Sequence, residues 1–533
     1  MTPPPPSRAP RVLTAFAILA LALLGAAALR LHLAWKIHVP TLDSAIPPQM
    51  ALDILGGRHH LFFAGQSYLG ALESYLMALT FLVLPVTRVT MTLVPIACAL
   101  AWVLATYAFF RRDYGPLPAL AAALVPAFPG WQALWYTTAP YGGYPETYLL
   151  GLLLLLLARP FIAPAPPFTP TRRHALALAL LTGLSLWVNL QILPYLAAAA
   201  LAGLLALRQH PTPFRPWLAY LAIPAAAILA FLPQFLAEPS HVQPPLFDGL
   251  TLGAIAKSIR ALWRHDLRHL LLWTYPPAAL HHLVALALVA LVAAAAILAY
   301  RRRRSARRAT PATLLVLATL AAFALTYFPH PMSGFIPRYL IAPTTLLLSW
   351  ALAECAASAR RPLRLAAYAL ALLLVAYNTY GAIRTARLRA PPARQTLDEF
   401  TRVIQAARAA GHDAVLHAGS ETEGYDAARL TLLAHPAPLF ASAYSDRFLD
   451  HQLAWEFGQA PAWLARARHL PYIAGSYAAL SLPLPPVTDA PPYVLIPTPS
   501  VPRHIEHSIL PDTIAHWPAP PRQHPLFDRT PQT

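Results

Sequence analysis

The chain has 533 residues, of which 57% are hydrophobic and only 12% are charged. Soluble domains carry about 25% charged residues, so this composition excludes an ordinary soluble protein. The formal net charge of +18 does not indicate nucleic acid, because the basic residues stand in short runs beside apolar segments and are not gathered on one folded face. That distribution is typical of a protein that crosses a membrane several times.

Apolar segments near the roughly 20 residues that cross a bilayer recur along most of the chain. Short basic loops stay cytoplasmic, and placing Arg111-Arg112 and Arg301 to Arg304 on that side gives a consistent alternation. The pattern predicts about eleven spans. They lie near residues 12–34, 89–110, 116–134, 143–158, 175–190, 193–207, 217–236, 281–300, 312–328, 339–357 and 363–382.

A large outer region is predicted between the first two spans, at residues 36–85. Its apolar stretch at 72–86 is long enough to suggest another span, but counting it as one would turn every arginine cluster outward. We therefore predict a helix lying on the membrane surface there. An earlier helix is expected to start at Pro47-Pro48, since proline suits the first turn of a helix.

From about residue 385 the apolar density falls and Asp, Glu and Pro become frequent. Residues 397–412 read as an amphipathic helix, 414–419 as a strand, 425–435 as a helix and 438–442 as a strand. We expect a transmembrane domain at 1–384, a soluble α/β domain at 385–500 and a Pro-rich tail at 501–533. The fold class is thus mainly α, a polytopic transmembrane helical bundle with a small C-terminal domain.

Several polar residues are predicted at one face of the membrane, outside the arginine-marked side. Asp43 follows the first span, Glu73 lies in the first outer region, Glu146 at the start of the fourth span and Arg338 before the tenth. Carboxylates at a membrane edge are costly and by default mark a functional site, although each can also cap a helix or meet interfacial water. Lys257, in a later outer loop, suits a lipid headgroup as well as a site.

The chemistry of these groups favours transfer from a phosphate carrier. A carboxylate can act as general base on an acceptor hydroxyl, and a guanidinium can hold a phosphate and stabilise its developing charge. No Gly-rich nucleotide loop is present, so a lipid-phosphate carrier fits the predicted topology better. No spacing of His, Asp or Glu predicts a metal site, and Cys98 and Cys355 imply no disulfide.

At this point the residues resemble a known family. The stretch DILGGRHHLFFAGQSYLGALESYLMA, which begins ten residues after Asp43, resembles the first outer loop of GT-C-fold glycosyltransferases. These are integral-membrane enzymes related to protein O-mannosyltransferases and lipid A aminoarabinose transferase. Arg338-Tyr339 in PRYLIAP resembles their recurrent Arg-Tyr motif, and SLWVNLQILPYL and YDAARLTLLAHPAPLFAS resemble a bacterial branch. The resemblance covers about residues 12–460.

The resemblance implies an inverting transfer of a sugar from a polyprenyl-phosphate donor to a lipid, glycan or protein acceptor. The reaction would take place at the extracytoplasmic face of a bacterial inner membrane, among membrane lipids, with no cofactor expected and a divalent cation left open. Asp43 and Glu146 would be catalytic, Arg338, Lys257 and Tyr339 would bind the donor phosphate, and Glu73, Gln66 and Tyr68 would order the loop or the acceptor.

Two departures from the family leave the acceptor open. Ser44 follows Asp43 where protein mannosyltransferases carry Asp-Glu, and Gly65-Gln66-Ser67 stands where aminoarabinose transferases carry Glu-Lys-Pro. Two other functions also remain. A multi-span lipid or solute transporter or flippase would need polar residues at mid-membrane depth and discontinuous helices. A non-catalytic GT-C-like assembly protein would keep the fold and bind the donor without turnover.

Overall fold

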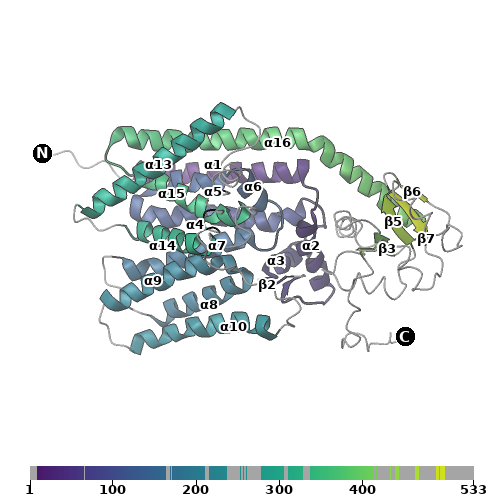
Figure 1. The fold of residues 1–533 in the computed structure, drawn as a ribbon, viewed down its shortest axis with the longest axis horizontal. Helices are drawn as coiled ribbons and strands as arrows, with labels where there is room; N and C mark the ends of the chain where they lie inside the picture. Colours follow the sequence, from purple (N-terminus) through teal and green to yellow (C-terminus); the bar gives the residue numbers. More distant parts are fainter. Residues whose placement is uncertain are drawn as a thin grey trace. The chain divides into compact units, whose positions relative to one another are not determined.

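The computed structural model describes residues 9–64, 66–163, 171–209, 215–236, 278–304, 310–327 and 337–411, five later strands and a few single residues between them. It forms two compact units, Met1–Ala393 and Arg394–Thr533. The described part of the first unit is almost entirely helical (Figure 1). The mainly α class expected from the sequence is thereby confirmed.

Every predicted span coincides with a helix. These helices are α1 (Ala9–Ile37), α4 (Leu93–Tyr114), α5 (Pro116–Ala127), α7 (Tyr144–Ala158), α8 (Arg172–Val188), α9 (Leu193–Gln209), α10 (Ala222–Leu236), α13 (Ala278–Arg304), α14 (Pro311–Tyr327), α15 (Ile341–Ala356) and α16 (Arg361–Ala409). Within the described residues, seven segments are long and apolar enough to cross a membrane. The number eleven therefore stays a prediction.

The outer surfaces of these helices are apolar, as a lipid environment requires. Leu21 is 68% exposed and Leu325 is 74% exposed, whereas soluble proteins rarely leave large continuous apolar surfaces uncovered. Inside, α4 packs against α5 and α7, and α5 packs against α15. Small residues line the α5–α15 contact, where the hydroxyl of Ser349 donates to the carbonyl of Ala122 at 3.0 Å. The chain is a multi-pass membrane protein.

The third predicted span is shorter than expected. The sequence suggested residues 116–134, but α5 ends at Ala127 and a separate short helix, α6, runs from Trp131 to Tyr136. Pro129 explains the break, because proline disfavours helical geometry in the residue before it. Phe128 accordingly adopts φ −126° and ψ 66°.

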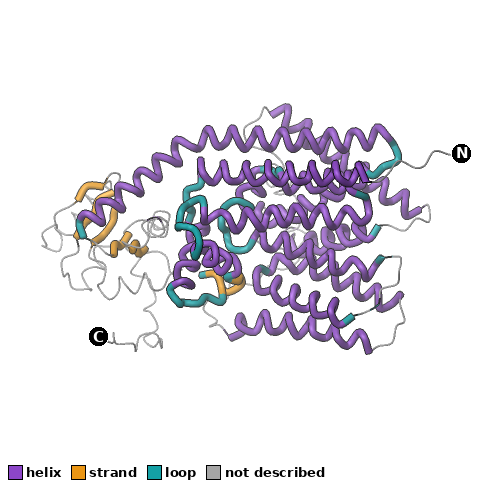
Figure 2. Tube along the Cα trace, turned by 180° about the vertical axis from the view of Figure 1, so that it is seen from behind, coloured by secondary structure: helices purple, strands orange, loops and turns teal. Residues whose placement is uncertain are grey.

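The first outer region forms a small layer at one end of the bundle (Figure 2). It consists of α2 (Leu42–Leu55), the antiparallel strands β1 (Phe62–Phe63) and β2 (Gln66–Gly70), and α3 (Leu72–Phe81). With 10 residues, α3 is only about 15 Å long, too short to cross a bilayer, in accord with the predicted surface helix. An isolated bridge from Leu69 to Asn189 attaches β2 to the corner between α8 and α9.

The predicted start of α2 at Pro47 is wrong. The helix begins five residues earlier, and Asp43 lies in its first turn. A capping box explains the earlier start: the side chain of Thr41 accepts from the backbone N–H of Ser44, and the Ser44 hydroxyl bonds the backbone N–H of Thr41. A carboxylate in the first turn also interacts favourably with the helix dipole.

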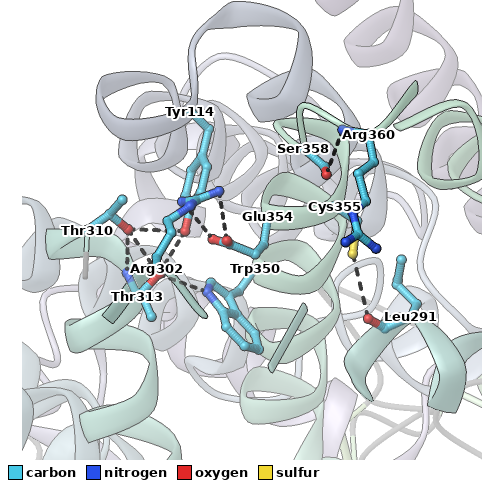
Figure 3. A network of polar contacts seen from close by, with 10 residues as sticks. All are labelled: Tyr114, Leu291, Arg302, Thr310, Thr313, Trp350, Glu354, Cys355, Ser358 and Arg360. Carbon is cyan, nitrogen blue, oxygen red and sulfur yellow. Dashed lines mark hydrogen bonds and ion pairs between the residues drawn. The ribbon is translucent and has the colours of Figure 1, made fainter. Parts of the chain in front are cut away.

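The other end of the bundle carries a buried polar network (Figure 3). The carboxylate of Glu354 is fully buried and pairs with Arg302 at 2.8 Å. The Tyr114 hydroxyl lies 2.9 Å from the hydroxyl of Thr313, which also accepts from the indole N–H of Trp350. These contacts join the ends of α4, α13 and α15 to the start of α14.

The second unit contains a mixed five-stranded sheet in the order β4-β3-β5-β7-β6. Its strands are β3 (Ala414–His417), β4 (Leu439–Ser442), β5 (Ala462–Arg466), β6 (Thr488–Ala490) and β7 (Tyr493–Pro497). The predicted strands at 414–419 and 438–442 coincide with β3 and β4, which pair in parallel. The predicted helix at 425–435 is almost wholly outside the described residues, and the tail at 501–533 lies entirely outside them.

The predicted domain boundary at residues 384–385 falls inside α16, which continues unbroken to Ala409. The last part of this helix buries Phe400, Val403, Ile404 and Ala407. That spacing places the four side chains on one face, as expected for the amphipathic helix predicted at 397–412.

Candidate active site

The candidate site is organised by a short loop between α6 and α7, residues 137–143, called here the site loop. Gly142 and Gly143 have φ values of +83° and +86°, a region that L side chains rarely adopt. This backbone turns both N–H groups toward Glu73, whose Oε2 accepts from Gly142 at 2.6 Å and from Gly143 at 3.2 Å. The loop and α3 are thereby held together.

Two acidic residues are buried beneath the site loop. Glu73 lies in the first turn of α3 and Glu146 in the first turn of α7, and each is 2% exposed. Burial raises the pKa of Glu73 well above its ordinary value, and the charge of Glu146 raises it further, against the effect of the two glycine N–H groups. Two carboxyl groups whose charges interact in a dry setting share a proton more readily than they both ionise.

The Glu73–Glu146 pair retains unused hydrogen-bonding capacity. Oε1 of Glu73 has no hydrogen-bond partner within the part of the chain that the structure describes, whereas the Glu146 carboxyl interacts with its own backbone N–H and with the thiol of Cys98. Unpaired buried acceptors are unfavourable unless they hold a proton or meet a ligand. This is a second reason to treat Glu73 as protonated.

Asp43 approaches the same loop beside Thr41. The Thr41 hydroxyl donates to the hydroxyl of Tyr141 at 3.4 Å, and the indole N–H of Trp135 donates to that same hydroxyl at 2.8 Å. Burial raises the pKa of Tyr141 to about 12, and the carboxylate of Asp43 adds to the rise. The half-buried Asp43 therefore lies within electrostatic reach of the site loop.

Arg338 lies in the 3-10 turn η7 (Pro337–Leu340) that precedes α15. Its guanidinium stands over the ring of Tyr144 at 5.8 Å and over the ring of Tyr339 at 5.5 Å. These are cation–π distances. Its Nε is buried and has no partner among the described residues, so the side chain keeps a donor for an anion.

A row of aromatic rings lies between the surroundings of Asp43 and those of Arg338. The ring of Tyr136 lies 4.7 Å from that of Tyr141 and 5.2 Å from that of Tyr144. Asp43 is thus connected to Arg338 through three tyrosines, and Glu73 meets Glu146 below them. The structure places the four residues that the sequence singled out at this face around the two ends of α6 and the site loop, with the rings of Tyr136, Tyr141 and Tyr144 between Asp43 and Arg338.

The remaining predicted site residues are less informative. Gln66 is half-buried on β2 and pairs with Phe63, and Tyr68 lies on the same strand. Tyr339 is half-buried beside Arg338. Lys257 lies outside the described residues. Among the residues that the structure describes, no group of three or more His, Cys, Asp or Glu side chains is placed to hold a metal ion.

The bundle has an apolar recess at the start of α15. It is lined by residues from α5, α6, α13, α15 and α16 and the segment between α5 and α6, among them Phe128, Gly130, Leu288, Ile341 and Leu348. Ile341 begins α15 directly after the turn that carries Arg338. Arg338 itself does not line the recess, but it precedes Ile341 by three residues.

Sequence reasoning missed several residues of this region. Tyr136 and Tyr141 belong to the segment WYTTAPYGGY, whose aromatic residues and paired glycines were a usable signal. Arg30 is the sole Arg, Lys, Asp or Glu within the predicted span 12–34, which also marks it out. His38 is 1% exposed and neither ring nitrogen has a partner in the described part of the chain. Burial and then the charge of Arg88 lower the pKa of His38 to about 4.

Comparison with solved structures gives the fold a name. ArnT from Cupriavidus metallidurans in the apo state matches with a TM-score of 0.56 and 11% identity, covering 90% of this chain and 97% of that one. The chain has the ArnT fold. ArnT bound to undecaprenyl phosphate matches likewise, with a TM-score of 0.54, 11% identity and coverage of 92% and 98%.

The expected GT-C fold is therefore confirmed, and at this identity the likeness to ArnT concerns the fold alone. The archaeal oligosaccharyltransferase AglB from Archaeoglobus fulgidus, solved with an inhibitory peptide and a dolichol-phosphate, is less similar. Its TM-score is 0.45 at 13% identity, with coverage of 93% of this chain and 77% of that one. No protein-family model matches the chain, and no curated protein matches it in sequence.

Proposed function

We propose that this protein is an inverting glycosyltransferase that moves a sugar from a polyprenyl-phosphate donor to an acceptor at the extracytoplasmic face of the membrane. The observation that carries the proposal is Arg338, a guanidinium whose Nε has no partner among the described residues, three positions before Ile341, which lines an apolar recess. A lipid phosphate combines the two features that this arrangement recognises, an anionic head and an apolar chain. ArnT, which shares the fold, has been solved with undecaprenyl phosphate bound.

On the donor side, Arg338 is proposed to hold the phosphate and Tyr339 to orient the guanidinium by its ring. A guanidinium forms two parallel hydrogen bonds to a phosphate. Its charge also offsets the negative charge that grows on the phosphate as the sugar departs. By its place in the sequence, Lys257 belongs to the same proposal.

On the acceptor side, Asp43 is proposed as the general base. The acceptor oxygen attacks the anomeric carbon while Asp43 takes its proton, and the bond from that carbon to the phosphate oxygen breaks. The electron pair of the broken bond stays with the polyprenyl phosphate, and attack from the opposite face inverts the anomeric centre. Asp43 is half-buried and so has solvent or acceptor access that the carboxyl groups below the loop lack.

Glu146 takes a different proposed role from the catalytic one that the resemblance implied. At 2% exposure its carboxyl group is not open to an acceptor. We propose that it keeps Glu73 protonated, and that Glu73 in turn holds Gly142 and Gly143 in place. The pair then fixes the loop on which Tyr141 stands and the start of the helix that carries Tyr144.

The test uses purified protein in lipid nanodiscs, a panel of radiolabelled undecaprenyl-phosphate sugars, and lipid, glycan and peptide acceptors. We expect transfer to an acceptor, and Asp43→Asn to reduce it by about 100-fold or more, the usual contribution of a general base. Asp53→Asn is the matched control, because Asp53 lies on the same helix but pairs with Arg58 and His60. Transfer that survives Asp43→Asn unchanged would overturn the assigned base.

A second experiment distinguishes a glycosyltransferase from a flippase and from a non-catalytic assembly protein. Sealed proteoliposomes are given the same labelled lipid, and its movement across the bilayer is measured beside its cleavage. Movement without bond cleavage would replace the glycosyltransferase proposal by a flippase. Donor binding without cleavage or movement would indicate an assembly protein that keeps the fold.

A further inference from the structure

Arg30 is the largest fully buried side chain of the described residues, and it lies on α1 within the bundle. All three of its side-chain nitrogens are engaged. Nη1 donates to the carbonyls of Ala127 at 2.9 Å and Ala26 at 3.3 Å, and Nη2 donates to the carbonyl of Pro126 at 3.0 Å. Nη2 and Nε also donate to the hydroxyl of Thr137, at 3.2 Å and 3.4 Å. Each of these acceptors is uncharged.

The acceptors lie at the two ends of one segment. Pro126 and Ala127 end α5, where carbonyls lack helical partners and carry the negative end of the helix dipole. Thr137 caps the end of α6. A single guanidinium therefore clamps both ends of the stretch between them. Asn378 on α16 adds one more fixed point, donating to the carbonyl of Phe128 at 2.7 Å.

The clamped segment carries the side chains that meet the site. Trp135 on α6 donates to Tyr141 on the Asp43 side. Tyr136, its neighbour, packs against Tyr144, whose ring lies under Arg338. We call the surroundings of Asp43 and Tyr141 the base side, and the surroundings of Tyr144 and Arg338 the phosphate side. The position of α6 therefore sets the spacing between the base side and the phosphate side. Moving its end at Thr137 would displace both contacts at once.

We propose that Arg30 is a positioning residue of the active site, acting through α6 to hold the base side and the phosphate side at a fixed separation. The inference rests on the proposed function for the meaning of that separation. Lysine is a poor replacement, since its three donors lie on one nitrogen and do not reach the α5 carbonyls and Thr137 together as a planar fork does. Arg30 touches no substrate.

The test compares Arg30→Met, Arg30→Lys and a stability control, Glu354→Gln, in nanodiscs. Glu354 is as deeply buried and its ion pair stabilises the opposite end of the bundle. Hydrogen exchange is followed on peptides that contain Gly142 and Gly143, whose amides are bonded to Glu73. For Arg30→Met we expect exchange there to rise about tenfold more than in α4 or α15, with Arg30→Lys in between. Glu354→Gln should lower the Tm without this local rise.

Turnover provides the second readout, measured per folded molecule. Arg30→Met should lower kcat and raise the donor KM together, and Arg30→Lys should restore part of both, because the two sides are displaced jointly. Exchange in the site loop that does not change, or that rises equally in all helices, would overturn the proposal. The exchange measurement needs no activity, so a wild type without transfer would refute the proposed function and leave this inference testable.

Discussion

The backbone N–H of Gly142 donates to the carboxyl oxygen of Glu73 at 2.6 Å, across 69 positions of sequence. This bond connects the first outer region to the loop between α6 and α7. Its donor exists in this orientation because Gly142 has a φ of +83°. Glu73, Glu146 and the site loop therefore form one structural unit, and a substitution in the acidic pair should alter the loop, as a substitution in the loop should alter the pair.

Replacing Gly142 by alanine should break that unit. The added Cβ would lie 2.7 Å from a ring carbon of Phe63, in a backbone conformation that alanine resists. We expect the free energy of unfolding to fall by about 2–4 kcal/mol and sugar transfer to be reduced. Gly57→Ala is the matched control, since Gly57 has φ +85° but nothing within 4 Å of the new atom. Equal losses of thermal stability in both variants would show that the contact with Phe63 is unimportant.

Stability should depend on pH through Glu73. Its pKa is raised in the folded protein, so the folded state binds more protons than the unfolded state above the ordinary value of 4.5. The stabilisation is thus complete below that value and is lost as pH rises through the folded pKa. We expect the Tm to fall from pH 6.5 upward, and Glu73→Gln to flatten the slope. Below pH 6.5 the lowered pKa of His38 acts in the opposite direction. A slope unchanged in Glu73→Gln would contradict the assignment.

Arg338→Met should weaken donor binding without unfolding the protein. The side chain is half-buried and contributes cation–π contacts of about 0.5–2 kcal/mol, so some stability is lost as well. Loss of a charged contact to phosphate predicts at least a tenfold rise in the Kd for undecaprenyl phosphate. Arg301→Met, an exposed arginine at the end of α13, serves as control. Equal binding by both variants would remove Arg338 from the donor site.

The polar network at the other end of the bundle should matter for stability and not for transfer. Tyr114→Phe removes a hydroxyl that lies 2.9 Å from Thr313 and 3.1 Å from Thr310. We expect the free energy of unfolding to fall by about 0.5–1.5 kcal/mol, because the hydrogen bonds of the tyrosine are lost while Thr310 and Thr313 still bond each other, and we expect an unchanged kcat. Thermal unfolding and transfer assays on one preparation decide the matter. A lowered kcat would mean that the two ends are coupled.

Apolar runs flanked by arginines were sufficient to predict the helices of the bundle, because lipid leaves the backbone few alternatives to a helix. The predicted helix ends were wrong where one or two residues start or stop a helix. Thr41 and Ser44 start α2 before the prolines that seemed to mark its beginning. Pro129 ends α5 early although the sequence around it stays apolar. Caps and breaks depend on one or two residues, and an average over a window hides them.

The candidate site was predicted as a set of residues and not as an arrangement. The topology placed Asp43, Glu73, Glu146 and Arg338 at one face, and the structure brings them to one loop. The predicted topology did not reveal that Glu73 accepts from glycine amides or that the ring of Tyr136 lies between those of Tyr141 and Tyr144. Such contacts join segments far apart in sequence, and no local pattern encodes them.

The bonds of Arg30 also bear on how the protein is made. Its partners Pro126, Ala127 and Thr137 follow it by 96 to 107 positions, so they are synthesised long after α1 has reached the bilayer. Until then the guanidinium lacks these partners, at a cost on the order of 2.5–3.5 kcal/mol on insertion scales. The first helix therefore enters the membrane in a less favourable state than its final one. The hydrogen bonds of Arg30 to α5 and α6 can form only after these helices have been synthesised, so the interior of the bundle is completed in the order of translation.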